Sequence, residues 1–106
     1  MCNEIVAVRP SASPSEFRLG RPLPNPSVSG TTVELSLPYP AWTELAVFDP
    51  QGARVRTIHA GVVGAGITRM HWDGRTDHGH PAGTGLYFIR MNAGGKVYGQ
   101  RVVLLR

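Results

Sequence analysis

The chain has 106 residues, of which 42% are hydrophobic and one is a cysteine, and it carries a formal net charge of +4. This length allows one domain with one hydrophobic core, while a single cysteine excludes an internal disulfide and a multi-cysteine zinc site. No apolar run approaches the roughly 20 residues of a transmembrane helix, so we expect no membrane insertion.

Arginine supplies most of the positive charge. Ten of the 11 basic residues are arginines, and a strongly basic chain can indicate a nucleic-acid partner. Here Arg54, Arg69 and Arg90 are single charges on different predicted strands, and they form no stripe with interleaved exposed aromatic residues. We therefore expect no nucleic-acid partner.

The first 16 residues are predicted to be a tail or linker that precedes the domain. A short β-like run at 5–8, which could end a preceding domain, is followed by a segment rich in proline and serine at 10–15. Neither a basic region nor a long apolar region of a signal peptide is present at the start. We therefore place the domain at 17–106 and expect any export signal on a longer parent chain.

The domain is expected to open with a short strand at 17–19 and a proline-rich segment at 21–26. The three prolines of that segment remove three backbone donors, so it cannot be a central strand. We expect it to run extended along a sheet edge and to turn at Asn25-Pro26. Residues 30–37 then alternate between apolar and polar side chains, which predicts a half-buried strand that ends before Pro38.

Residues 42–49 are predicted to form a central strand, because the later part of this segment is apolar on both faces. Asp49-Pro50-Gln51-Gly52 fits a type I turn, with proline second and glycine fourth. Residues 54–58 are expected to pair back as a hairpin. A glycine-rich connection is predicted at 61–66.

Three further segments complete the predicted strands. Residues 67–72 form one strand, and residues 86–91 form the next. A tight hairpin turn at 92–95 leads to the last strand, 96–106. The chain thus has about seven short strands without helical periodicity. This pattern predicts an all-β, immunoglobulin-like antiparallel β-sandwich that lacks the usual disulfide.

Residues 71–87 join two of these strands and contain two aspartates, three histidines and four glycines. Glycine, proline and aspartate favour turns, so we expect a wide hairpin or a corner between sheets. Trp72 and Tyr87 are predicted to anchor this connection in the core.

Several motifs occur together in an order that is typical of one family. They are Pro24-Asn25-Pro26, residues 32–38, residues 45–55, Trp72-Asp73-Gly74-Arg75, Gly85-Leu86-Tyr87-Phe88 and residues 101–106. In these motifs the chain resembles the C-terminal sorting domain of type IX secretion substrates. It is equally similar to the related immunoglobulin-like domain of the flagellar hook-capping protein. The resemblance covers about 17–106, with Ser27 standing where the family often has an aromatic residue.

The resemblance implies a non-catalytic module of a secreted or cell-surface bacterial protein. A sorting domain would direct secretion of a larger parent protein across the outer membrane and its anchoring at the surface. Its partners would be the secretion translocon or neighbouring domains of the parent. The alternative is a structural or adhesive module of an extracellular assembly, like the hook cap, without a sorting role.

The last strand is the strongest candidate for partner recognition. It is apolar on both faces, and at a sheet edge it could pair with a strand of a partner. An ordinary core strand is the alternative interpretation. The candidate recognition residues are Lys96, Val97, Arg101, Val102, Val103, Leu104, Leu105 and Arg106.

Asp73 and Asp77 are the candidate ligands for a metal ion. Calcium takes carboxylate and backbone oxygens, but calcium loops usually supply more carboxylates at alternate positions. We therefore favour turn capping for both aspartates. His78 and His80 would need a third ligand to bind a transition metal, and we interpret them as exposed loop residues. Neither a metal nor another cofactor is expected.

No pattern indicates catalysis. Ser27, Ser29 and Ser36 lie in turn or strand settings without a nucleophile elbow, and Cys2 has no evident partner. No glycine-rich loop opens a helix to hold phosphate. We expect the protein not to be an enzyme.

Overall fold

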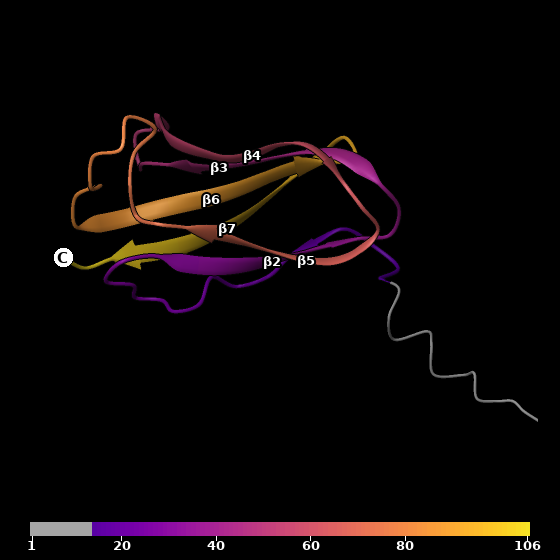
Figure 1. The fold of residues 1–106 in the computed structure, drawn as a ribbon, viewed down its shortest axis with the longest axis horizontal. Helices are drawn as coiled ribbons and strands as arrows, with labels where there is room; N and C mark the ends of the chain where they lie inside the picture. The colour runs from indigo at the N-terminus through magenta and orange to yellow at the C-terminus, as the bar shows by residue number, and fades with distance from the viewer. Residues whose placement is uncertain (1–13) are drawn as a thin grey trace, which may run out of the picture.

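The computed structural model describes residues 14–106, which form seven strands in two layers (Figure 1). Most of the predicted tail at 1–16, including the run at 5–8, lies outside the described residues. The all-β sandwich predicted from the sequence is confirmed. The strands are β1 (Arg18–Leu19), β2 (Thr31–Leu37), β3 (Ala41–Phe48), β4 (Arg54–Val63), β5 (Gly66–Trp72), β6 (Gly85–Ala93) and β7 (Lys96–Leu104).

The strands form one three-stranded and one four-stranded antiparallel sheet. The strand orders are β1-β2-β5 and β4-β3-β6-β7. The strand at 42–49 was predicted to be central, and β3 indeed lies between β4 and β6. Its register places Ala46 opposite Arg90 of β6 and opposite Thr57 of β4.

The predicted turn chemistry is confirmed at two hairpins. In the β3–β4 turn, the Gly52 amide donates to the Asp49 carbonyl at 3.0 Å, and the Asp49 carboxylate accepts from the amides of Gln51 and Ala53. In the β6–β7 hairpin, Gly94 and Gly95 form a two-residue loop with φ of +59° and +79°. Positive φ at both positions is what a type I′ turn requires, and glycine provides it without steric cost.

The glycine-rich segment at 61–66 forms more regular structure than predicted. β4 extends through Gly61 to Val63, paired with β3 up to Ala41, and β5 begins at Gly66. The ladder of hydrogen bonds to β3 therefore overrides the weak strand preference of glycine. Two register shifts, characteristic of β-bulges, occur earlier in this pairing, between Leu45 and Ala46 and between Val47 and Phe48.

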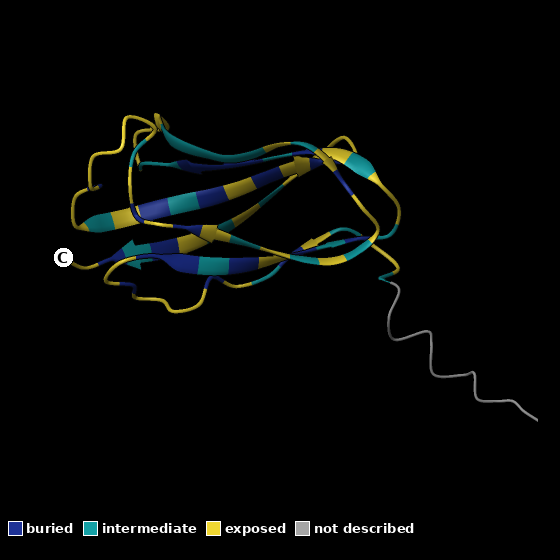
Figure 2. Cartoon of the chain, viewed as in Figure 1, coloured by how far each residue is buried: buried dark blue, intermediate teal, exposed yellow. Residues whose placement is uncertain are grey.

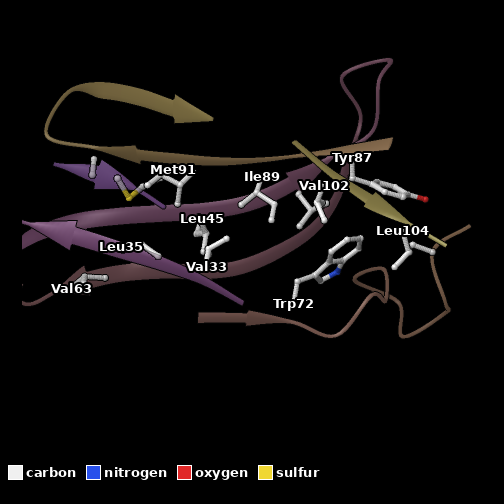
Figure 3. Packing of buried hydrophobic residues seen from close by; sticks show 14 of the residues in the cluster. Val33, Leu35, Leu45, Val63, Trp72, Tyr87, Ile89, Met91, Val102 and Leu104 are labelled. Atoms are coloured by element: carbon white, nitrogen blue, oxygen red, sulfur yellow. The ribbon is translucent and has the colours of Figure 1, made fainter. Parts of the chain in front are cut away.

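Alternating burial along the strands places one core between the sheets (Figure 2). The largest fully buried side chain is Trp72, which is 1% exposed. Its ring meets that of Tyr87 edge-on, with centroids 5.3 Å apart and planes at 65° (Figure 3). β5 and β6 belong to different sheets, so residues 73–84 form a corner between sheets, and the two rings meet across the core.

Replacing Trp72 with alanine should lower the free energy of unfolding by roughly 3 to 5 kcal/mol, because the cavity cannot be filled by neighbours in both sheets. Chemical denaturation measures the change. Trp42→Ala is the matched control, because Trp42 is 64% exposed and its loss should change stability by under about 0.5 kcal/mol. Equal effects of the two substitutions would contradict the assignment of Trp72 as the core anchor.

Candidate functional site

The predicted recognition strand, β7, is one of the two edge strands of the four-stranded sheet. Val102 and Leu104 are fully buried, and Val103 is half-buried. The other candidates on or beside this strand are exposed: Lys96, Val97, Arg101, Leu105 and Arg106. β7 thus combines a core face with an edge position, as both interpretations of the sequence allowed.

The second half of this edge is already covered by residues 25–27. The side-chain amide of Asn25 donates to the Arg101 carbonyl at 3.0 Å and accepts from the Val103 amide at 2.9 Å. The Ser27 amide donates to the Val103 carbonyl, and its carbonyl accepts from the Leu105 amide, both at 2.8 Å. A partner strand therefore cannot pair with residues 101–105 unless this segment leaves.

The same segment is bonded to the opposite sheet just before it reaches β7. Leu23 exchanges two backbone hydrogen bonds with Thr32 of β2, each of 2.9 Å. The predicted extended run along an edge is thus observed, and the run passes from one sheet to the other. Ser27 is buried, and its hydroxyl bonds to both the amide and the carbonyl of Gly30.

A short part of the β7 edge remains uncovered. Backbone groups in an antiparallel strand point alternately toward the neighbouring strand and away from it. The backbone groups of residues 101, 103 and 105 that bond to residues 25–27 point away from β6. Val97 and Gly99 occupy the same alternating positions of β7, so their amides and carbonyls also point outward. Neither residue makes a backbone bond outside its pairing with β6 in the described part of the chain. Val97 and Gly99 thus form the accessible section of this edge.

The corner at residues 73–84 is held by its own hydrogen bonds and by bonds to β4. The Asp73 carboxylate accepts from the Arg75 amide at 3.0 Å and lies 3.4 Å from the Arg56 guanidinium. The Asp77 carboxylate accepts from the Thr57 amide at 3.0 Å, while the Asp77 amide donates to a β4 carbonyl. Both aspartates therefore serve as hydrogen-bond acceptors in this corner.

The aromatic and glycine residues of the Trp72–Tyr87 stretch set the shape of the corner. The Trp72 indole donates to the Arg75 carbonyl at 2.9 Å, and the Tyr87 hydroxyl donates to the Gly83 carbonyl at 2.6 Å. Gly74 has a φ of +77°, and a Cβ there would lie 2.6 Å from the Arg106 guanidinium. Gly85 begins β6 opposite Leu104.

Arg106 connects this corner to the end of β7. Its guanidinium donates to the carbonyls of Gly74 at 2.5 Å and Ala82 at 2.7 Å, while its backbone amide bonds to the Thr84 hydroxyl. The candidate recognition residue Arg106 is therefore engaged within the domain through its side chain.

Within residues 14–106, no three His, Cys, Asp or Glu side chains are arranged to hold a metal ion. His78 and His80 are exposed in the corner, and His71 lies 3.0 Å from the Thr32 hydroxyl on the outer face of the other sheet. The same described residues contain no helix long and apolar enough to cross a membrane.

A group of residues on the outer face of the four-stranded sheet did not emerge from the sequence. Trp42, Glu44, Arg90 and Asn92 face the same side, because β3 and β6 are neighbours in a fixed register. An available signal in the sequence was Trp42, which shares the polar Glu44 face of the alternating strand rather than the Leu45 and Val47 face. The pairing of β3 with β6, which places Arg90 and Asn92 beside Trp42 and Glu44, is decided by the tertiary structure.

The comparison with family models identifies a family for this chain. A model described as the FlgD Ig-like domain matches residues 25–96. The chain belongs to this family. The match spans the segment that covers β7, the buried Trp72 corner and the β6–β7 hairpin. No curated protein sequence matches the chain.

Solved structures with the same fold include two from Porphyromonas gingivalis. Dimeric latent PorU aligns with a TM-score of 0.59 and 18% identity, over 85% of this chain and 9% of PorU. PorZ, described as an essential bacterial surface component of the type IX secretion system, aligns with a TM-score of 0.53 and 21% identity, over 91% of this chain and 13% of PorZ.

A third structure shows how widely this fold is used. The DNA glycosylase AlkC of Pseudomonas fluorescens, bound to DNA with an abasic site analog, aligns with a TM-score of 0.54 and 14% identity, over 89% of this chain and 32% of AlkC. The chain spans at most about a third of each of these three proteins. At these identities the likeness concerns the fold.

Replacing Asn25 with alanine should destabilise the domain by about 1 to 2 kcal/mol, because it leaves a donor and an acceptor of β7 without their partner. Denaturation measures the loss, and amide exchange at Val103 should accelerate. Asn92→Ala is a suitable control, because the Asn92 side chain makes no hydrogen bond within residues 14–106. Unchanged exchange at Val103 would contradict the bridging role of Asn25.

Calcium should leave the unfolding midpoint unchanged. A ligand that binds the folded state alone raises that midpoint, and the two aspartates already accept hydrogen bonds from the protein. Thermal unfolding in calcium chloride and in chelator compares the two conditions. A higher midpoint in calcium that is lost in Asp73→Asn would identify a structural ion.

Proposed function

We propose that this domain is a non-catalytic module that directs secretion of a larger parent protein across the outer membrane and its anchoring at the bacterial surface. The proposal rests on one observation: the edge strand β7 leaves the backbone groups of Val97 and Gly99 accessible to a partner strand. Membership of the FlgD Ig-like family and the shared fold with PorU and PorZ support an exported or surface-associated setting.

Recognition would proceed through β7 in two steps. A strand of the translocon, or of a neighbouring domain, would first pair with the outward backbone groups of Val97 and Gly99. Extension along residues 101–105 would require displacement of residues 25–27, which hold those positions with four hydrogen bonds. The covered half of the edge thus protects the free domain from unwanted pairing.

A non-enzymatic role agrees with the chemistry of the acidic groups. Asp73 and Asp77 accept backbone hydrogen bonds, while Glu34 and Glu44 pair with arginines. Immunoglobulin-like sandwiches of this family are typically non-catalytic. These carboxylates therefore have structural partners that account for them.

The second candidate is a structural or adhesive module of an extracellular assembly, as in the flagellar hook cap. The family match favours it directly, because the family is defined by the immunoglobulin-like domain of FlgD. In that role β7 would pack permanently against a neighbouring domain, and no secretion machinery would recognise it.

Fusion of the full chain to the C-terminus of a periplasmic reporter tests sorting. In a host with a type IX secretion system, the reporter should reach the surface or the medium, and in the same host without the translocon it should stay in the periplasm. Cell fractionation and surface protease treatment measure its location.

Two variants make the test specific to β7. Val97→Pro removes one outward donor at the accessible edge of β7 and should reduce export at least about tenfold. The control Ile67→Pro makes the same change on edge strand β5 of the other sheet and should leave export unchanged. Both variants are checked for folding by circular dichroism. A folded wild-type fusion that remains periplasmic would exclude sorting and leave the structural candidate.

A further inference from the structure

The outer face of the four-stranded sheet carries an ordered set of polar and aromatic side chains. The β3–β6 register places Glu44 opposite Asn92 and Ala46 opposite Arg90. The β6–β7 register continues these two rows to Val97 and Gly99, respectively. Trp42 lies one step further along β3, beside Val62 of β4. Side chains from four strands thus meet on one surface.

Two adjoining hollows run along this surface. One, with a volume of about 150 Å³, is lined by Glu44, Ala46, Phe48, Arg90, Asn92 and Val97. The other, of about 410 Å³, is lined by Ala41, Trp42, Glu44, Asn92, Ala93, Gly94 and Gly95. Because Glu44 and Asn92 line both, the hollows form one continuous groove, which we call the Trp42–Arg90 groove.

The length of the groove suits an extended polymer. From Trp42 to Ala46, which lies opposite Arg90, the strand advances four residues, or roughly 13 Å at about 3.3 Å per residue. The hollow near Trp42 is bordered by Gly94 and Gly95, which lack side chains that would close it. A chain-like ligand can therefore enter at the hairpin and continue toward Arg90.

The polar groups of the groove have unused hydrogen-bonding capacity. Within residues 14–106, the Arg90 guanidinium and the Asn92 amide form neither a salt bridge nor a side-chain hydrogen bond. Arg90 instead lies over the Phe48 ring, 4.9 Å from its centroid. This contact orients the guanidinium while leaving its N–H donors available.

The charge of the groove favours an anion. Glu44 is its only acidic lining residue, and it lies 3.4 Å from the Arg54 guanidinium. Arg54 also lies over the Phe48 ring, at 5.8 Å. Arg54, which does not itself line the hollows, pairs with Glu44 and offsets its charge, so Arg90 is the uncompensated charge of the described groove. Arg90 is the member that can make a new bidentate contact with a carboxylate.

Trp42 supplies an apolar platform at the other end. It is 64% exposed, and the adjacent Val62 and the nearby Val97 are exposed as well. An indole in water presents a broad, weakly hydrated face with a polar N–H at its edge. The C–H face of a sugar ring fits such a surface, while its hydroxyl groups can bond to Asn92 and Glu44.

We propose that the Trp42–Arg90 groove binds an anionic polysaccharide with uronic-acid carboxylates. One sugar ring stacks on Trp42, Asn92 bonds to hydroxyl groups, and Arg90 binds a carboxylate. A single-stranded nucleic acid fits less well, because two guanidinium groups already cover the Phe48 ring and Trp42 alone is free for stacking. This inference is independent of recognition through β7.

The test uses the full chain with polygalacturonate, and the same polymer after reduction of its carboxylates to alcohols. Affinity electrophoresis and calorimetry should show binding to the acidic polymer at least about tenfold tighter than to the neutral one, decreasing with salt. Trp42→Ala and Arg90→Gln should each weaken binding about tenfold. Glu44→Gln should strengthen it, because it removes the negative charge from the groove.

Matched controls lie away from the groove. Tyr39→Ala removes another exposed aromatic residue, and Arg69→Gln removes an exposed arginine from the outer face of the three-stranded sheet. Neither should change the affinity, and all variants should keep the wild-type circular dichroism spectrum. Absence of binding to polygalacturonate, or binding that Trp42→Ala and Arg90→Gln leave unchanged, would overturn the proposal. Tighter binding of single-stranded DNA than of polygalacturonate would overturn it as well.

Discussion

Residues 23–27 hold the two sheets together along one side of the sandwich. Leu23 bonds to β2 of the three-stranded sheet, and Asn25 and Ser27 bond to β7 of the other. β1 has only two residues, and this segment extends the closure on that side beyond it. The side chain of Asn25 supplies both the donor and the acceptor that the edge of β7 needs, in a stretch where prolines have no amide to offer. How much of β7 a partner can reach therefore depends on this segment.

The opposite edge of the four-stranded sheet is protected by comparable means. Asp77 bonds to both an amide and a carbonyl of β4, so the corner between the sheets covers the start of that strand. The corner itself rests on the buried Trp72 and is joined to the end of β7 by Arg106. Its two aspartates, which were the candidate metal ligands in the sequence, instead stabilise the corner by accepting hydrogen bonds. Protected edges prevent uncontrolled pairing between copies of a β-sandwich.

Two surfaces of the described residues 14–106 carry the proposed contacts with other molecules. The accessible edge at Val97 and Gly99 offers backbone groups, which suit a partner strand regardless of much of its sequence. The Trp42–Arg90 groove offers side chains with defined chemistry, which suit a particular class of ligand. Val97 belongs to both surfaces. Its amide and carbonyl point outward in the plane of the sheet, while its side chain lines the groove on the outer face. A strand at the edge and a polymer on the outer face would therefore contact different groups of the domain.

Local chemistry in the sequence was sufficient to predict the elements of the fold. Period-two alternation placed β2, proline and glycine placed the turns, and the size and apolarity of Trp72 indicated its burial. The partners of these elements were decided only by tertiary structure, because alternation determines which face a residue occupies and not which strand lies beside it. For this reason β4 continues through Gly61, and Asn25 bonds to residues of β7 that follow it by 76 and 78 positions. The same pairing of β3 with β6 brings Trp42, Arg90 and Asn92 into one groove.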